Sequence, residues 1–307
     1  MSKLVRVASW ENVGKDISNV KGYENIINEA GLNFNVVKRK LQFNLCGSKH
    51  TIPNKMVTVR EDDPNQIFGV VGNNYNICQN VEAFEFINDV ADVNFIKAGQ
   101  TKGGISYIIG ELPEVEVLGD NIKPHIIFSN SHDGFRGIRA NICMLRIVCQ
   151  NQFAASFKDA ANAINIKHTN VMNQRLIEAK ETMKHTYEYI ANYKNMAEKY
   201  VSKKVTNEDL QNIIRTMFNV KPEESLDDLN PIKQRRVDYF KDALNNEDNQ
   251  NFKGTAWGVI NAFTDFATHV PTRNKNIELA NDNRFVQNTL QSRQFDKFIN
   301  IVDSIAA

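Results

Sequence analysis

The spacing of hydrophobic residues changes near the middle of this chain, and the change restricts the folds that it can adopt. Before residue 140, short runs rich in Val, Ile, Phe and Thr alternate with polar residues and are broken by turn signals such as Asn73-Asn74 and Gly103-Gly104, as in the strands of hairpins. After residue 140, apolar residues recur at steps of three and four, the spacing of amphipathic helices. We therefore predict an α+β fold, with a mostly antiparallel sheet in the N-terminal half packed by helices.

Two segments of the strand-rich half carry more specific signals. Residues 35–60 contain turn signals at Gly47-Ser48 and at Pro53-Asn54 and predict a hairpin or a meander. Residues 80–91 have the apolar stripe of an amphipathic helix, with Asn80 as its N-cap. We therefore expect one helix to interrupt the strands.

The helical half opens with a long pattern. From Met172 to Tyr200 the apolar residues follow a near-heptad seam, and Thr169 or Asn170 would cap the helix. A helix of about 30 residues would be about 45 Å long, which is more than the core of one domain requires. We expect it to project as a long helical arm of the C-terminal half or to pack against a partner helix.

The chain is expected to divide into three parts. Residues 1–167 would form a β-rich α+β core, residues 168–251 a helical arm or insertion, and residues 252–307 helices that return to the core. The third part begins with GTAWGVINAFTDFATH, whose aromatic and branched residues recur at helical spacing. This pattern predicts a buried core helix.

The charge balance limits the classes of partner. The chain has 37 Lys and Arg against 36 Asp and Glu, a formal net charge of +1, so any contact with a polyanion must be local. No stretch approaches the roughly 20 apolar residues of a membrane span, and the start MSKLVRVASWENVGKD lacks the apolar centre of a signal peptide. We expect a cytoplasmic protein that does not contact membranes.

The cysteines do not predict a metal site. Cys46, Cys78, Cys143 and Cys149 form no CxxC pair, and no His lies at zinc-finger spacing from them. Each lies in or beside an apolar run, so we expect buried free thiols. We predict neither a metal nor a cofactor.

One segment is locally basic. Residues 121–175 contain seven Lys and Arg and only two Asp and Glu, a net charge of +5. Its guanidinium groups can pair with phosphate oxygens, and Phe135 lies among them, where an aromatic ring could stack on a base of a single strand. We predict these nucleic-acid-binding residues: Ser131, His132, Phe135, Arg136, Arg139, Arg146, Lys158, Lys167 and Arg273.

The motif SNSHDG at residues 129–134 leaves three interpretations open. A polar cluster followed by Gly at the end of a strand is typical of a structural turn, and the same loop could contact a ligand. In the third interpretation, His132 acts as a general base that Asp133 orients. Triad members are normally brought together from distant positions of a chain, so the pattern favours binding over catalysis.

Three sequence blocks carry a resemblance to a known family. SNSHDG at 129–134, RIVCQN at 146–151 and GTAWGVINAFTDFATH at 254–269 resemble the recurring blocks of the phage/plasmid-like family that carries the domain of unknown function 932. The resemblance implies that such genes are carried by mobile elements, often near replication and recombination functions. It favours a role in DNA metabolism by this association alone.

These observations predict a nucleic-acid-binding protein that prefers single-stranded DNA and acts as a homo-oligomer in replication, recombination or annealing. If the gene belongs to a phage, the protein acts in the cytoplasm of the host cell. Two alternatives remain open at this point. One is a nucleotide- or DNA-processing enzyme that uses His132 and Asp133, and the other is a factor that binds a host protein.

Overall fold

The fold is α+β, as predicted, with two antiparallel sheets in the N-terminal half and helices in the C-terminal half. The computed structural model describes residues 8–89, 93–154, 163–166, 186–271, 275–291 and 293–305. None of the helices in these ranges is long and apolar enough to cross a membrane.

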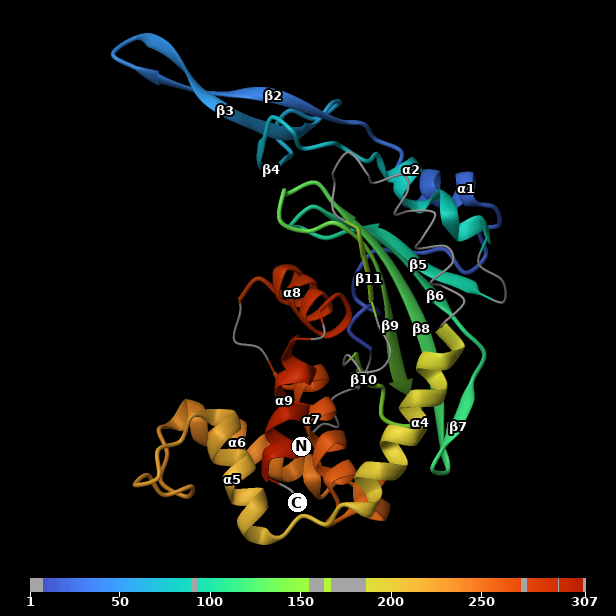
Figure 1. The fold of residues 1–307 in the computed structure, drawn as a ribbon, viewed down its shortest axis with the longest axis vertical. Coiled ribbons are helices and arrows are strands. Elements are labelled where there is room, and N and C mark those ends of the chain that lie inside the picture. Colours follow the sequence, from blue (N-terminus) through green and yellow to red (C-terminus); the bar gives the residue numbers. More distant parts are fainter. Residues whose placement is uncertain are drawn as a thin grey trace.

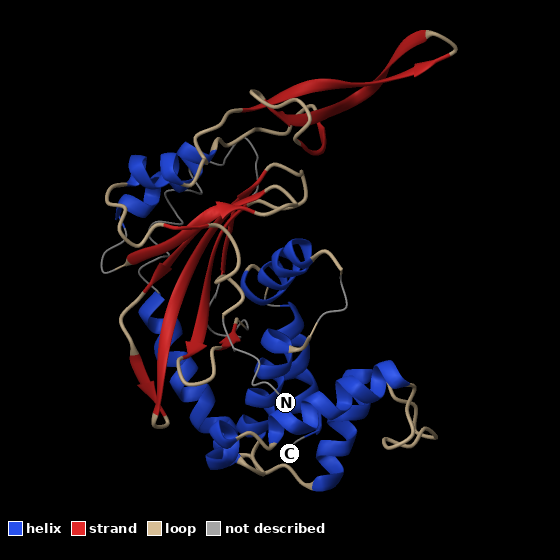
Figure 2. Cartoon of the chain, turned by 180° about the vertical axis from the view of Figure 1, so that it is seen from behind, coloured by secondary structure: helices blue, strands red, loops and turns tan. Residues whose placement is uncertain are grey.

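The larger sheet forms the centre of the molecule (Figures 1 and 2). Its neighbouring strands run in the order β1 (Lys15–Asp16), β5 (Asn94–Gln100), β6 (Ile105–Glu111), β8 (Asp120–Ser131), β9 (Ile138–Arg146) and β10 (Asn151–Phe153), while β7 (Val115–Val117) pairs with β8 and β11 (Ala163–Ile166) with β9. The turn predicted at Gly103-Gly104 joins β5 to β6, and Gly104 has the positive φ that such a turn requires.

Helices cover both faces of the central strands β8 and β9, whose residues are buried almost throughout. On one face, α1 (Tyr23–Glu29), α2 (Asn80–Phe84) and the 3-10 helix η1 (Glu85–Asp89) pack near Phe128 and Asn130. The helix predicted over residues 80–91 is present in its described part, but its N-cap is Gln79 and not Asn80, and it continues as a 3-10 helix from Glu85. On the other face, α8 (Ile277–Thr289) places Phe285 against Tyr107 of β6, with ring centroids 4.5 Å apart.

The remaining helices form one core with α7 (Ala256–His269) at its centre. Residues Ala256 to Phe266 are all buried, which confirms the predicted core helix. Around it lie α4 (Thr186–Ser202), α5 (Asn207–Phe218), α6 (Pro231–Leu244), η3 (Glu247–Phe252) and α9 (Arg293–Ile305). Helix α5 begins at a reciprocal cap between Thr206 and Asp209.

The described part of the expected helical arm packs against its own chain. Along α4, Tyr189, Tyr193, Ala197 and Tyr200 are buried, and the ring of Tyr193 lies 5.7 Å from that of Trp257 on α7. The seam therefore faces the core from residue 186 onward. The first part of the predicted helix lies outside the described residues.

The element that projects from the molecule is a β-hairpin. Strands β2 (Val36–Leu45) and β3 (Ser48–Arg60) form the second sheet with β4 (Ile67–Gly72), and the hairpin extends beyond β4 into solvent (Figure 1). Its turn is at Cys46-Gly47, where both residues have positive φ. Cys46 is exposed, so the expectation that every cysteine is buried is wrong for this residue.

The turn predicted at Pro53-Asn54 is also wrong, because β3 runs through it. The pairing register shifts between Lys40 and Gln42, whose partners on β3 are Met56 and Thr51. The extra residues of β3 form an irregularity in the ladder. A proline, which has no N–H to donate, is tolerated at such a position.

The second sheet is held to the first by the turn between β8 and β9. The buried Thr58 hydroxyl donates to the carbonyl oxygen of His132 at 2.7 Å, and Phe68 packs edge-on against the His132 ring with centroids 5.3 Å apart. Gly69 lies so close that a Cβ atom there would overlap the main chain of Asp133. The direction in which the hairpin projects therefore depends on this contact.

The N-terminal and C-terminal segments meet on the face of the large sheet that α8 covers. Ser9 N–H donates to Oε1 of Gln152 at 2.8 Å, and the Ser9 hydroxyl lies 3.0 Å from that of Thr289. Gln152 also donates to the Thr289 hydroxyl at 3.2 Å. All three side chains are buried, so β10, α8 and the start of the described chain are joined by one polar cluster.

Substitution of Gly69 tests the contact between the sheets. We expect Gly69→Ala to lower the free energy of unfolding by about 1–3 kcal/mol, the usual cost of forcing extra atoms into a packed site. Gly72→Ala, also on β4 but with open space around its Cβ position, should change it by less than about 0.5 kcal/mol. Urea unfolding of both variants measures the difference, and equal effects would contradict a tight junction.

Candidate nucleic-acid interface

The motif SNSHDG forms a turn at the end of β8, as one of the three interpretations predicted. The Asp133 carboxylate oxygen Oδ1 accepts hydrogen bonds from the backbone N–H groups of Phe135 and Arg136, both at 2.8 Å. Gly134 has φ of 82°, a value that favours glycine. Burial raises the pKa of Asp133, but the N–H donors and the Arg136 guanidinium outweigh it and hold the pKa below its usual range.

His132 and Asp133 do not form a general base and its orienting group. His132 is completely buried, and its Nε2 lies 3.3 Å from Oδ1 of Asn80 at the start of α2. The Asp133 carboxylate instead accepts hydrogen bonds from the N–H groups of the turn and lies 2.6 Å from the Arg136 guanidinium. The two side chains therefore act on different parts of the fold.

Phe135 is the most exposed large apolar side chain of this region. It lies at the tip of the β8–β9 turn with 89% of its surface exposed. Arg136 follows it and is partly exposed, although it pairs with Asp133. An exposed aromatic ring beside a guanidinium is the combination expected for stacking on an unpaired base.

Arg139 lies at the start of β9, where no acidic side chain of the described ranges neutralises it. It is half-buried, its Nε has no hydrogen-bond partner, and no carboxylate pairs with it among the described residues. Burial and then the charge of Arg136 lower the pKa of its guanidinium, while Asp133 acts in the opposite direction. An anion bound here would supply the interaction that the described part of the chain does not.

Arg139 and Arg136 share a small pocket with Ser131. Its free space is about 10 Å³, the room of about one water molecule. The Ser131 hydroxyl is buried and has no partner in the described part of the chain. The pocket is lined by Ile105, Ser129, Ser131, Arg136, Gly137, Arg139, Leu290 and Gln291. It can hold one atom of an anion, such as a phosphate oxygen, or a bridging water.

Arg146 does not belong to this surface, and its prediction as a binding residue is wrong. It lies seven residues from Arg139 along β9, a separation of roughly 23 Å, and only 4% of its side chain is exposed. Its guanidinium lies 2.6 Å from the Asp120 carboxylate and donates to the carbonyl oxygen of Asp248 at 3.0 Å. Lys158, Lys167 and Arg273 lie outside the described residues.

Reasoning from sequence missed a second basic surface, on the projecting hairpin. Residues 36–60 contain six Lys and Arg and no Asp or Glu. Arg39, Lys40, Lys49 and Lys55 are exposed. The net charge of these strands is +6, higher than the +5 of residues 121–175. A count of charges along the sequence would therefore have found this surface.

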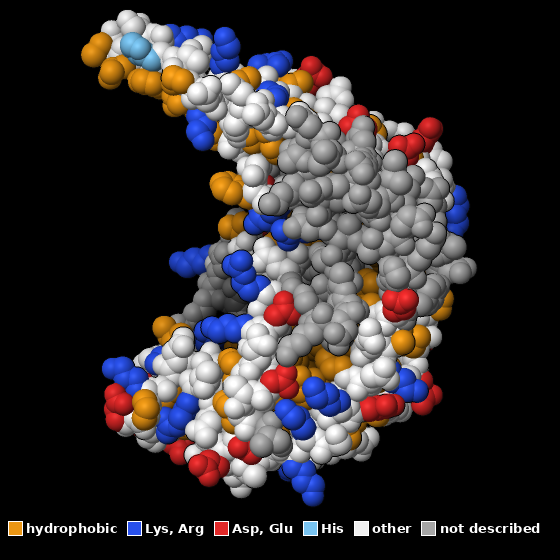
Figure 3. Space-filling view, in the orientation of Figure 1, with side chains coloured by type: hydrophobic (Ala, Val, Ile, Leu, Met, Phe, Trp, Pro, Cys, Tyr) orange, Lys and Arg blue, Asp and Glu red, His pale blue; other side chains and the backbone are white. Residues whose placement is uncertain are grey.

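The hairpin and the β8–β9 turn border one hollow. Figure 3 shows the molecule as a crescent whose inner wall carries Lys and Arg side chains, between the hairpin at one end and the helical part at the other. The β8–β9 turn reaches this wall in Figure 1. A strand of nucleic acid lying in the hollow would pass Phe135 and its neighbouring arginines.

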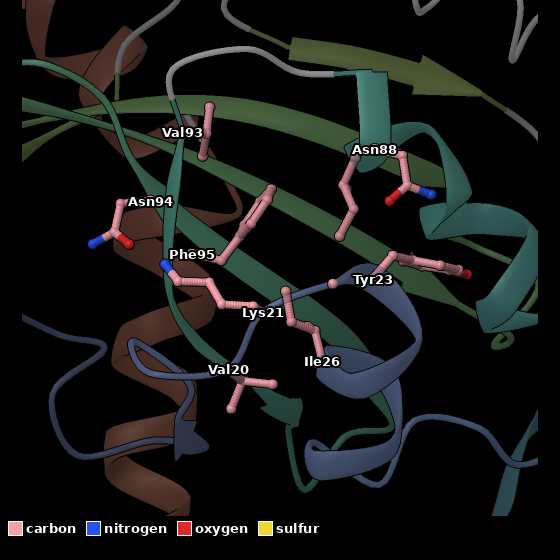
Figure 4. A pocket seen from close by; sticks show the side chains of 10 residues that line it. Val20, Lys21, Tyr23, Ile26, Asn88, Val93, Asn94 and Phe95 are labelled. Carbon is pink, nitrogen blue, oxygen red and sulfur yellow. The ribbon is translucent and has the colours of Figure 1, made fainter.

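A separate pocket near α1 has no catalytic chemistry in its described lining. It encloses about 230 Å³ between the segment before α1, η1 and β5 (Figure 4). Val20, Ile26 and Phe95 make its apolar walls, and Lys21 is the single charged residue in its lining. Across the described ranges, no group of three or more His, Cys, Asp or Glu could hold a metal ion.

The buried position of Arg146 leads to a prediction about stability. Asp120→Ala leaves the guanidinium buried without its carboxylate, so we expect the free energy of unfolding to fall by about 3 kcal/mol. Glu114→Ala removes a carboxylate from the more exposed pair with Lys123 and should cost at most about 1 kcal/mol. Chemical denaturation of both variants compares them, and a cost for Asp120→Ala no larger than for Glu114→Ala would refute the structural role of Arg146.

Comparison with known proteins identifies a family without a stated activity. The family model described as a domain of unknown function, DUF932, matches residues 67–301. Comparisons with curated proteins and with solved structures found no significant match. The match covers β4, the β8–β9 turn and helices α4 to α8, while the hairpin strands β2 and β3 precede it.

Proposed function

The chain belongs to the DUF932 family, whose name assigns no activity, and we propose from the geometry of its own residues that it binds single-stranded nucleic acid. The strand lies in the basic hollow and passes the tip of the β8–β9 turn. This proposal keeps Ser131, Phe135, Arg136 and Arg139 from the sequence prediction and adds the basic hairpin.

The observation that carries the proposal is the presence of an exposed aromatic ring, Phe135, and a half-buried guanidinium, Arg139, at one turn. An aromatic side chain with 89% of its surface exposed is costly to leave in water. The half-buried Arg139 guanidinium has lost part of its hydration, and no carboxylate of the described residues compensates for this loss. A base stacked on Phe135 and a phosphate at Arg139 would satisfy both. Phe135 lies at the tip of the turn, and Arg139 lies at the start of β9, which follows it.

A single strand fits this arrangement better than a duplex. A ring at the tip of a turn can stack only on a base whose face is free, and such bases occur in single strands. The local cations supply a contact with the backbone that does not depend on sequence. The proposal retains the expected role in phage or plasmid replication, recombination or annealing, because these processes expose unpaired strands.

Removal of the ring tests the stacking contact. We expect Phe135→Ala to weaken binding of a labelled single-stranded oligonucleotide by about 5- to 150-fold, since base stacking contributes about 1–3 kcal/mol. The salt dependence should not change, because no charge is removed. Val148→Ala removes an exposed apolar side chain beyond the far end of β9 and serves as the control. Equal affinities of the two variants, measured by fluorescence anisotropy, would exclude stacking on Phe135.

Two charge changes at the turn should act in opposite directions. Arg139→Gln is expected to weaken binding and to reduce the slope of log affinity against log salt by about 0.7, the value for one phosphate of a single strand. Asp133→Asn keeps an oxygen that accepts the two turn N–H groups but releases Arg136, so affinity should rise by up to about fivefold.

The control for these charges lies on the opposite side of the molecule. Lys194→Gln removes an exposed cation of α4, which Figures 1 and 3 place away from the hollow, and it should leave the slope unchanged. Salt titrations of all three variants provide the measurement. If Arg139→Gln and Asp133→Asn both behaved as Lys194→Gln does, the phosphate site would not be at this turn.

A further inference from the structure

The projecting β2–β3 hairpin carries four cations that no acidic side chain of the described residues neutralises. Residues 36–60 contain six Lys and Arg and no Asp or Glu. Two of the six are engaged near the base of the hairpin, where Lys38 donates to backbone carbonyl oxygens and Arg60 pairs with Asp62. The other four are exposed or partly exposed and have no ion pair within the described ranges: Arg39, Lys40, Lys49 and Lys55. Such a surface is complementary to a polyanion.

The four cations are distributed over both faces of the ribbon. Side chains of a strand alternate, so Arg39 and Lys40 of β2 point to opposite faces. Lys49 is on the face of Lys40, because it pairs with Asn44, which shares that face. Lys55 is on the face of Arg39, because its neighbour on β3 pairs with Lys40. A flat anionic surface such as a membrane would meet only one face, whereas the groove of a duplex has a phosphate backbone on either side of a ribbon.

The hairpin is less suited than the β8–β9 turn to stacking on unpaired bases. Phe43 is the single Phe, Tyr or Trp of residues 36–60, and its ring already stacks on that of His50, with centroids 5.3 Å apart. Phe135, by contrast, has 89% of its surface exposed. Cations that are not accompanied by a free ring can still contact the phosphates of a duplex, whose bases are stacked on each other.

The dimensions of the hairpin match the major groove of B-form DNA. This groove is about 12 Å wide and admits a two-stranded ribbon. The residues of β2 from Arg39 to Leu45 span about 24 Å, the length of about seven base pairs. The major groove of an A-form RNA duplex is too deep and narrow for side chains to read. The ribbon therefore fits a DNA duplex and not an RNA duplex.

The apolar side chains of the outer hairpin also find a partner in this groove. Phe43 is 47% exposed and Leu45 is 58% exposed. Strand β4 pairs with β3 only from Lys55 to Val59, so no third strand of the described chain covers the outer part. Thymine methyl groups line the major groove and contact apolar side chains. Such a contact would remove from water the apolar surface that the hairpin leaves exposed.

The hairpin leads directly to the β8–β9 turn. Lys55 pairs with Gly72 of β4. The residue before Gly72, Val71, lies so close to Gly134 that a Cβ atom at Gly134 would overlap its side chain. Phe135 follows Gly134 at the tip of the turn. Figure 3 shows Lys and Arg side chains along the hairpin and again on the inner wall of the hollow, so a nucleic acid that lies on the hairpin can continue past Phe135.

We propose that the hairpin binds in the major groove of a DNA duplex, and that the preferred ligand is duplex DNA continued by a single-stranded tail. The inference rests on the proposed function for the tail, which passes Phe135 and Arg139. It assigns the hairpin to the paired part of the ligand and the β8–β9 turn to the unpaired part. The ligand is therefore a junction between paired and unpaired DNA.

A comparison of labelled ligands by fluorescence anisotropy tests this preference. The ligands are a blunt duplex of about 10 base pairs, one helical turn, the same duplex with a tail of about 10 nucleotides, and a single strand as long as the tailed strand. We expect the tailed DNA duplex to bind at least about tenfold more tightly than the single strand or the blunt duplex, because two contacts then act in one complex. A tailed duplex that binds no more tightly than the single strand would overturn the inference.

The same ligands made of RNA test the assignment to the major groove. The tailed RNA duplex should bind no more tightly than a single RNA strand of equal length, because the ribbon does not enter an A-form major groove. An equal gain in affinity from the duplex part in RNA and in DNA would show that this assignment is wrong.

Removal of two hairpin cations identifies the part of the ligand that they contact. For the tailed DNA duplex, Lys40→Gln with Lys49→Gln should reduce the slope of log affinity against log salt by about 1.8, since each phosphate contact in B-form DNA contributes about 0.9. The slope for the single strand should not change. Lys194→Gln with Lys199→Gln removes two exposed cations of α4 and should change neither slope. If the hairpin variant weakened binding of the single strand as much as that of the tailed duplex, the hairpin would contact unpaired strands and the inference would be wrong.

Failure of the proposed function gives a different result from failure of this inference. Phe135→Ala should weaken binding of the single strand and of the tailed duplex but not of the blunt duplex. If the wild type bound no single strand while Lys40→Gln with Lys49→Gln still reduced the slope for the blunt duplex, the proposed function would fail and the assignment of the hairpin would stand.

An anionic membrane is the other ligand that a basic ribbon with apolar side chains could meet. The wild type should not sediment with vesicles of phosphatidylserine and phosphatidylcholine in equal parts, because the cations of the hairpin do not lie on one face. Sedimentation with these vesicles that Lys40→Gln with Lys49→Gln abolishes would overturn the assignment of the hairpin to DNA.

Discussion

The crescent shape depends on one close backbone approach, where Gly69 of β4 lies against the turn between β8 and β9. This contact fixes the small sheet on the large one and so directs the hairpin away from the core. It also explains why the polar residues of SNSHDG are buried. Their main-chain and side-chain groups hold the turn and the junction, while Phe135, two residues beyond Asp133, is left in solvent.

The sequence predicted the elements of the fold more reliably than their exposure. Alternation in the first half and helical spacing in the second gave the α+β class, the turn at Gly103-Gly104 and the core helix at Trp257, because these depend on local patterns. The excess of basic residues over residues 121–175, by contrast, assigned Arg146 to the surface. Its partner Asp120 is 26 residues away on the neighbouring strand, so the sequence pattern around Arg146 does not predict that pairing.

The projecting arm shows the same limit. A heptad-like seam predicted a helix that projects as an arm or packs against a partner helix, and in its described part Tyr193 and Tyr200 face the core. The hairpin reaches outward instead, because β4 pairs with only part of β3. Whether a third strand pairs with the full length of a hairpin depends on the tertiary structure. An alternating sequence pattern is the same in a core strand and in an isolated two-stranded ribbon. Only the absence of acids from residues 36–60 marked this segment as different.

The hydrogen bonds of Ser9 have a consequence for biosynthesis. One of its partners, Thr289, lies 280 residues further along the chain, so this polar cluster cannot close until residue 289 has left the ribosome. Contacts of such long separation slow folding and leave apolar surface uncovered in the meantime. Until α8 has been synthesised, the face of the large sheet that it covers stays exposed. The nascent chain is therefore most prone to aggregation in that interval.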